Sequence, residues 1–204
     1  MKISVWVSGT GSILATMIAR GVPIELVLAD RPCKGLDIAK AAGIPSLLVD
    51  RTLDKFGYKK DVGENWDRKG FTEALMALCA DYKIELIAMA GFMTILHPVI
   101  FTRYKGRILN IHPSLLPQFK GERAVRDALN ERVETTGTTI HIATDSLDDE
   151  RYIVAQEKVP VFAGDNEDSL WERIKVVERN LYSIVLQDII SGALDLDDVI
   201  SRAP

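Results

Sequence analysis

Two polar side chains interrupt the end of an apolar run at positions 110 and 112, where the sequence reads ILNIHP. Residues two apart on a strand face the same side, so Asn110 would place an amide beside the imidazole of His112. Pro113 lacks the N–H that another ladder hydrogen bond needs, and we expect the strand to end there. Such a pair could stabilise an oxyanion and move a proton. A buried Asn and His with ordinary hydrogen-bond partners is the alternative reading.

The elements that must position this pair alternate along the chain. Apolar runs predict strands over residues 3–7, 24–29, 45–49 and 84–90, and helical spacing predicts helices over 13–20, 35–42 and 71–82. This alternation predicts an α/β fold, a mostly parallel twisted sheet with helices on both faces. Residues 138–143 and 152–161 predict an antiparallel C-terminal strand pair. The polar stretch 50–68 predicts a surface excursion.

A glycine-rich turn separates the first strand from the first helix, with the sequence SGTGS at residues 8–12. The free N–H groups of Gly11, Ser12 and Ile13 and the positive end of the helix would point to one place, which favours an anion. A tight structural turn remains the alternative, because glycine is the usual residue there. The spacing of the glycines matches neither a Walker loop nor a full dinucleotide-binding motif.

Composition excludes several classes of protein. The net charge is −4 and no long basic run occurs, which argues against a nucleic-acid partner. Cys33 and Cys79 are far apart and lack a partner motif, so we expect a reduced, cytoplasmic setting. No signal peptide or membrane span is predicted, and no His, Cys or acid cluster has the spacing of metal ligands. We expect one domain over residues 1–204.

Glu178 stands on the apolar stripe of a helix predicted to run to about residue 190. A carboxylate among apolar neighbours is costly unless it finds a partner. The sequence leaves two partners open, which are a buried Arg and a polar ligand. His141, on the predicted strand 138–143, is interpreted as a structural residue. The tail after Gly192 is expected to be a surface extension.

The segment NIHPSLLP at residues 110–117 resembles the folate-dependent formyltransferases, and MAGFM at 89–93 is similar to the preceding strand end of that family. The resemblance covers about residues 1–186 and favours the branch that acts on glycinamide ribonucleotide. It implies a Rossmann-like formyltransferase fold. A phosphate-binding half would span about residues 1–105, and a folate-binding and catalytic half about 106–190.

The resemblance also implies a reaction. The formyl group of 10-formyltetrahydrofolate would pass to the primary amine of glycinamide ribonucleotide in de novo purine biosynthesis, by direct attack through a tetrahedral intermediate. Asn110, His112 and Asp148 would be catalytic, without a metal. The partners would be these two small molecules, with no nucleic acid and no membrane, and the protein would be a monomer or homodimer.

Binding residues follow from the same resemblance. Gly11, Ser12 and Ile13 would hold the substrate phosphate, and Glu178 the ribose. The reduced folate would contact two loops, formed by Met93, Thr94, Ile95 and Leu96 and by Ala143, Thr144, Asp145 and Leu147. The chain departs from the family pattern at four positions, where the family usually has Asn for Ile13, a basic residue for Thr94, His near Arg123 and Gly for Glu150.

These departures keep other functions open. One alternative is a formyltetrahydrofolate hydrolase or a formyltransferase that acts on another amine. Another is a folate-binding or nucleotide-binding protein with impaired catalysis, because a fold alone does not establish an activity. The presence of Asn110, His112 and Asp148 together favours the enzyme.

Overall fold

The computed structural model of the chain describes residues 1–51 and 66–203. Most of the expected surface excursion at residues 50–68 therefore lies outside the described residues. The chain divides into two compact units, Met1–Ile108 and Leu109–Pro204. Within the described residues, no helix combines the length and the apolarity that crossing a membrane requires.

The first unit contains four parallel strands in the order β3-β2-β1-β4. They are β1 (Ile3–Val7), β2 (Ile24–Ala29), β3 (Ser46–Leu48) and β4 (Leu86–Met89). Every residue of β1 is buried, as expected for a central strand that is covered on both faces. The indole N–H of Trp6 donates to Ser4 Oγ at 3.0 Å, which satisfies a polar group inside this apolar layer.

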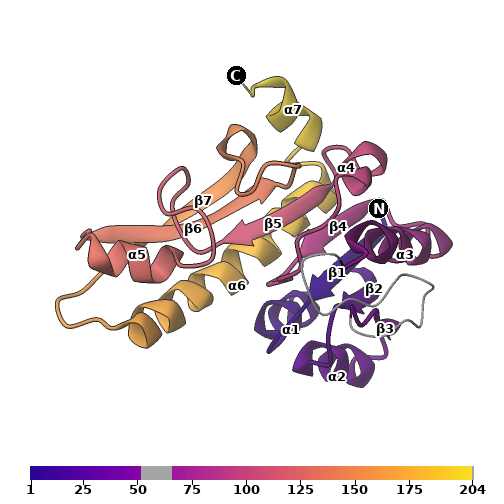
Figure 1. Cartoon of the computed structure of the whole chain (residues 1–204), viewed down its shortest axis with the longest axis horizontal. Helices are drawn as coiled ribbons and strands as arrows, with labels where there is room; N and C mark the ends of the chain where they lie inside the picture. Colours follow the sequence, from indigo (N-terminus) through magenta and orange to yellow (C-terminus); the bar gives the residue numbers. More distant parts are fainter. Residues whose placement is uncertain (52–65, 204) are drawn as a thin grey trace. The chain divides into compact units, whose positions relative to one another are not determined.

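The described residues of the first unit form the helices α1 (Ser12–Ala19), α2 (Lys34–Ala41), α3 (Arg68–Asp81) and the short α4 (Val99–Arg103) (Figure 1). The helix α2 packs against β2 and β3 and lies beside α1, whereas α3 contacts α4. Asp67 caps α3 by accepting a hydrogen bond from Gly70 N at 2.7 Å. The helix α4 was not predicted, because five residues are too few to show helical periodicity.

The second unit contains three strands, β5 (Ile108–His112), β6 (Thr135–Ile142) and β7 (Ile153–Pro160), of which β6 pairs antiparallel with both others. A 3₁₀ turn, η1 (Glu150–Tyr152), precedes β7. The predicted α/β fold class is therefore confirmed, with the antiparallel pairing extending to β5 as well as the predicted C-terminal pair.

The long helix α6 (Glu167–Ser191) packs on β6 and β7 and lies beside α5 (Ala124–Asn130), as Figure 1 shows. An apolar cluster of Val125, Val159, Leu170 and Ile174 joins α5, β7 and α6. The Tyr182 hydroxyl donates to the Leu109 carbonyl at 2.9 Å and ties α6 to β5. The tail, expected to be a surface extension, forms a further helix, α7 (Leu196–Ser201), that contacts β7.

Candidate functional site

The end of β5 holds the two polar residues that the sequence singles out. The antiparallel register places Asn110 opposite His141 and His112 opposite Thr139, so these four side chains share one face of the second unit's sheet. His112 is 5% exposed, and Asn110 is half-buried. The period-two argument for Asn110 and His112 therefore places both side chains on one face, as expected.

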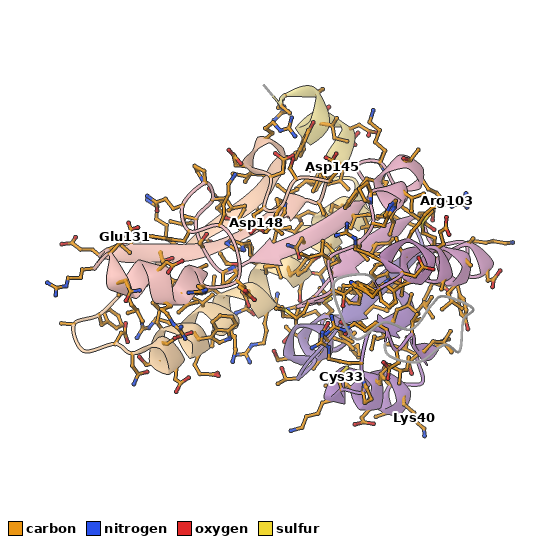
Figure 2. The ribbon with its side chains drawn as sticks, viewed as in Figure 1. Cys33, Lys40, Arg103, Glu131, Asp145 and Asp148 are labelled. Atoms are coloured by element: carbon orange, nitrogen blue, oxygen red, sulfur yellow. The ribbon has the colours of Figure 1, made fainter. Side chains whose placement is uncertain are left out.

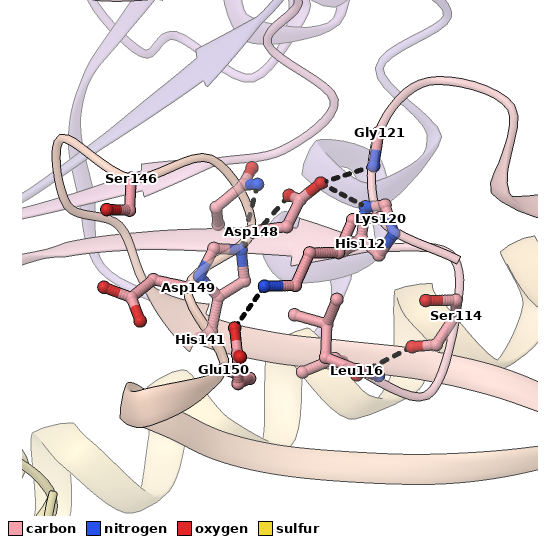
Figure 3. Close-up of polar contacts among 12 residues, drawn as sticks. His112, Ser114, Leu116, Lys120, Gly121, His141, Ser146, Asp148, Asp149 and Glu150 are labelled. Atoms are coloured by element: carbon pink, nitrogen blue, oxygen red, sulfur yellow. Dashed lines mark hydrogen bonds and ion pairs between the residues drawn. The ribbon is translucent and has the colours of Figure 1, made fainter. Parts of the chain in front are cut away.

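Both ring nitrogens of His112 have fixed neighbours, one of which is Asp148 (Figure 3). Its Nε2 lies 2.8 Å from the Phe119 carbonyl oxygen, and because a carbonyl only accepts, this nitrogen must carry a hydrogen. Its Nδ1 lies 3.4 Å from Asp148 Oδ2. This distance is longer than a strong hydrogen bond, and it places the carboxylate beside the imidazole, within reach of a proton on Nδ1. The pair is thus arranged to accept and return a proton.

Asp148 is 4% exposed and lies in a loop with a left-handed backbone, at φ +48°. Its Oδ2 accepts a hydrogen bond from the Gly121 N–H at 2.8 Å. Figure 2 shows Asp148 and Asp145 within the second unit, and Asp145 is exposed whereas Asp148 is buried. The expected convergence of Asp148 on His112 is therefore observed, and its catalytic role remains a prediction.

His141 joins the same cluster, in the structural role that its interpretation from the sequence gave it. Its Nδ1–H donates to the Ile142 carbonyl at 3.2 Å, so its Nε2 is free to accept from the Asn110 amide, also at 3.2 Å. Burial is the largest cause that lowers the pKa of His141 below its ordinary value. A neutral His141 therefore fixes the Asn110 amide and leaves its second N–H for another acceptor.

A buried network holds the loop that carries Phe119. Gln156 Nε2 donates to the Leu116 carbonyl at 3.0 Å and to Thr139 Oγ1 at 2.9 Å. The Thr139 hydroxyl donates to the Ser114 carbonyl at 2.7 Å and accepts from Leu116 N at 3.1 Å. These bonds tie the segment after β5 to β6 and β7, so the Phe119 carbonyl is fixed against His112.

The glycine turn in the first unit has the backbone that an anion site requires. Gly11 precedes α1 with φ +69°, and no side chain caps this helix. The first N–H groups of a helix have no intrahelical acceptor, so those of Ser12 and Ile13 remain available. The Ile13 side chain is buried, at 8% exposure, and offers no polar group where the resembling family has Asn. Phosphate binding at Gly11, Ser12 and Ile13 stays a prediction.

The predicted folate-binding residues in the loop after β4 differ in how far their side chains are exposed to solvent. Met93 and Ile95 are each 62% exposed, whereas Leu96 is buried and Thr94 is only 5% exposed. The Thr94 hydroxyl donates to the buried Asp30 Oδ2 at 2.5 Å, which is also held by Arg31. The side chain of Thr94 is thus committed to the protein, which leaves the apolar Met93 and Ile95 as the exposed surface of this loop.

The second predicted folate-binding loop, in the second unit, is stabilised by contacts to the Asp149 carboxylate. Thr144 Oγ1 donates to Asp149 Oδ2 at 2.8 Å, and Arg151 grips the same carboxylate through Nε and a terminal nitrogen. The Arg151 guanidinium lowers the pKa of Asp149 to about 2. Ala143 is buried, and Leu147 presents an apolar side chain that is 63% exposed.

Glu178 is buried on α6 at 8% exposure. Among residues 1–51 and 66–203, no hydrogen bond or ion pair to its carboxyl group is found, so the structure does not supply the buried Arg that the sequence left open. Burial raises the pKa of Glu178 to about 7, against the weaker opposing effects of Lys175 and Arg179. A buried acid without a protein partner is a candidate ligand-binding group.

The sequence matches the Formyl transferase family over residues 1–186. The chain belongs to this family. It is 36% identical to the phosphoribosylglycinamide formyltransferase of Escherichia coli K12 over 205 residues, which cover 97% of this chain and 91% of that protein. It is also 34% identical to the human trifunctional purine biosynthetic protein adenosine-3, with 97% of this chain covered, and spans only 19% of the length of that relative.

Solved structures agree with this membership. The glycinamide ribonucleotide transformylase 1 of Symbiobacterium toebii is 33% identical, with a TM-score of 0.84 over 94% of this chain and 88% of that one. The phosphoribosylglycinamide formyltransferase of Streptococcus pneumoniae TIGR4 is 32% identical, with a TM-score of 0.80 over 93% and 98%. The sequence resemblance to the formyltransferases is therefore confirmed.

Within this member of the formyl transferase family, sequence reasoning did not identify the residues that orient the three predicted catalytic side chains. His141, Gly121 and Phe119 contact Asn110, Asp148 and His112, and only strand register and loop path bring them there. A polar residue on the strand predicted to neighbour β5 was the one available signal for His141. In the described part of the chain, no group of three or more His, Cys, Asp or Glu could hold a metal ion.

Proposed function

We propose that this protein transfers the formyl group of 10-formyltetrahydrofolate to the primary amine of glycinamide ribonucleotide. The observation that carries the proposal is the buried cluster at the end of β5, where the Asn110 amide contacts His141 and the His112 imidazole lies beside the Asp148 carboxylate. Relatives named phosphoribosylglycinamide formyltransferase that match over most of their length support the substrate assignment.

The reaction begins when the amine nitrogen attacks the formyl carbon. The carbonyl electron pair moves to oxygen, and the second N–H of Asn110 donates to the oxyanion, with the His112 imidazole beside it. Such donors each contribute on the order of 10²–10³ in rate. Collapse of the tetrahedral intermediate restores the carbonyl and breaks the bond to the folate nitrogen. The proton that the attacking nitrogen loses is balanced by the one that the folate nitrogen gains.

The His112–Asp148 pair suits this proton transfer. It can give a proton to the leaving folate nitrogen and recover one from the amine, directly or through a water. His141 holds Asn110 and takes no part in the transfer. No residue needs to form a covalent intermediate, and the proposal includes no metal.

The other predicted residues complete the proposed assignment. In the first unit, the N–H groups of Gly11, Ser12 and Ile13 bind the phosphate, and Met93 and Ile95 offer apolar contacts to the folate. In the second unit, Glu178 accepts from the ribose hydroxyls, and Leu147 with the backbone of residues 143–145 binds the pterin. We further propose that residues 1–204 act as a single formyltransferase domain in the cytoplasm.

A formyl-transfer assay tests the proposal. We expect purified protein to form the folate product, followed by absorbance, only when both glycinamide ribonucleotide and the formyl folate are present. His112→Ala should lower kcat by at least about 10² while folate affinity changes little, because His112 acts in the transition state. Turnover without the nucleotide would instead indicate a hydrolase, and an unchanged rate in the variant would reject the assigned chemistry.

A further inference from the structure

Two loops of the second unit meet around Asp148, and two adjacent contacts join them. The Gly121 N–H donates to Asp148 Oδ2, and the neighbouring Lys120 forms an ion pair with Glu150 (Figure 3). Lys120 directly precedes Gly121, and Glu150 follows Asp148 by two residues. The ion pair therefore spans the same gap between the loops as the hydrogen bond to the proposed catalytic carboxylate.

Both loops hold backbone conformations that need support. Asp148 has φ +48° and Phe119 has φ +52°, in the left-handed region that residues other than glycine adopt rarely. Such conformations persist when surrounding contacts fix them. The Phe119 carbonyl accepts from His112, and the Asp148 carboxylate lies 3.4 Å from the other ring nitrogen of His112, so a shift of either loop would separate the pair.

The ion pair joins side chains of opposite charge from the two loops. The resemblance given above would place glycine, a residue that lets a loop move freely, at position 150. Here the side chain reaches across to Lys120, and the interaction with Lys120 lowers the pKa of Glu150. Both side chains are about two-fifths exposed, at 40% and 42%, so the pair is accessible to salt and its effect should be modest.

We propose that Lys120 and Glu150 are positioning residues that clasp the loop 117–122 to the loop 144–151 and so hold Asp148 against His112. The clasp replaces the freedom of a glycine with a charge-paired link. This inference rests on the proposed function for its effect on turnover, but its effect on the Gly121–Asp148 hydrogen bond can be measured without substrate.

A double-mutant cycle tests the clasp. Lys120→Met, Glu150→Gln and the double variant are compared with the unaltered protein by hydrogen exchange of the Gly121 amide. Each single change should speed exchange by about two- to fivefold, the range for an exposed ion pair, and the double variant should cost no more than either single one. Lys120→Arg keeps the charge and should restore slow exchange. Glu167→Gln, which breaks the exposed Arg126–Glu167 pair in the same unit, is the matched control and should leave Gly121 unchanged.

Turnover supplies the second readout. In the same variants kcat should fall by about two- to fivefold, with the KM for formyl folate changing less than twofold and the melting temperature constant. Additive or absent effects on Gly121 exchange overturn the clasp. Faster exchange with unaltered kcat overturns its positioning role. If the unaltered protein fails to formylate glycinamide ribonucleotide, the exchange cycle still decides whether the clasp exists.

Discussion

At the scale of single residues, the protonation state of His141 determines the orientation of the Asn110 amide. His141 donates from Nδ1 to a carbonyl and accepts at Nε2 from the Asn110 amide. If His141 were protonated, both nitrogens would be donors, and the Asn110 amide would lose its acceptor. The lowered pKa of His141 therefore protects the orientation of Asn110 at neutral pH.

Replacing His141 should expose this dependence. We expect His141→Leu to lower kcat by about tenfold, because a misplaced Asn110 forfeits part of the 10²–10³ that an oxyanion donor contributes. His141→Gln retains an oxygen that can accept from Asn110 and should recover most of the loss. Steady-state kinetics with both substrates measure this. Equal losses in the two variants would mean that Asn110 is held by something else.

At the scale of elements, the turn between β1 and α1 depends on a glycine for two reasons. Gly11 has φ +69°, and a Cβ there would lie 2.7 Å from the Gly35 Cα of α2. Neither backbone can give way without moving α1 or α2 away from the other. The close approach of the two helices thus requires glycine at this position.

We therefore expect Gly11→Ala to lower the free energy of unfolding by about 1–3 kcal/mol, the range for a strained backbone position. Gly9→Ala provides the control, since no atom lies within 4 Å of a Cβ at Gly9 and its φ is unremarkable for other residues. Urea denaturation of the two variants makes the comparison. Equal stabilities would show that the turn relaxes more readily than its packing suggests.

The sequence predicted those strands and helices in which the periodicity of apolar residues agrees with their burial. The buried run of β1 and the polar pair on β5 could be read directly, because period and burial agree there. Local sequence could not show that Asn110 lies opposite His141, which depends on the register of an antiparallel pair. It also missed that Thr94 turns inward to Asp30, since a Thr in a loop carries no sign of its direction. The helix in the tail was not predicted, because α7 is too short for its periodicity to stand out.

At the scale of the whole molecule, Glu178 links stability to pH. Its pKa rises on folding from an ordinary 4.5 to about 7, so the folded state binds a proton more tightly than the unfolded state. The favourable contribution is complete below about pH 4.5 and is lost as pH rises through about 7. Ionising this buried acid then costs about 3 kcal/mol, at 1.36 kcal/mol per pH unit.

Glu178→Gln should remove that cost. The variant should gain stability over the unaltered protein as pH rises from about 4.5 to 7, by up to about 3 kcal/mol, and the two should match in acid. Denaturant unfolding at a series of pH values measures the difference. Glu172→Gln, an exposed change on the same helix, should show a small trend of the opposite sign, because Lys175 lowers the pKa of Glu172. A constant difference at every pH would mean that Glu178 ionises normally in the fold.

Because Glu178 is buried without a partner among the described residues, binding of a ligand to its carboxyl group should be coupled to the release of a proton. At pH 7 about half of the free molecules carry a proton on this group, but ribose hydroxyls would donate best to its charged form. Binding of glycinamide ribonucleotide should then expel a fraction of a proton. The heat of binding, measured by calorimetry in two buffers with different ionisation enthalpies, should differ in proportion to that fraction. The difference should vanish in Glu178→Gln, and a buffer-independent heat in the unaltered protein would place the ribose elsewhere.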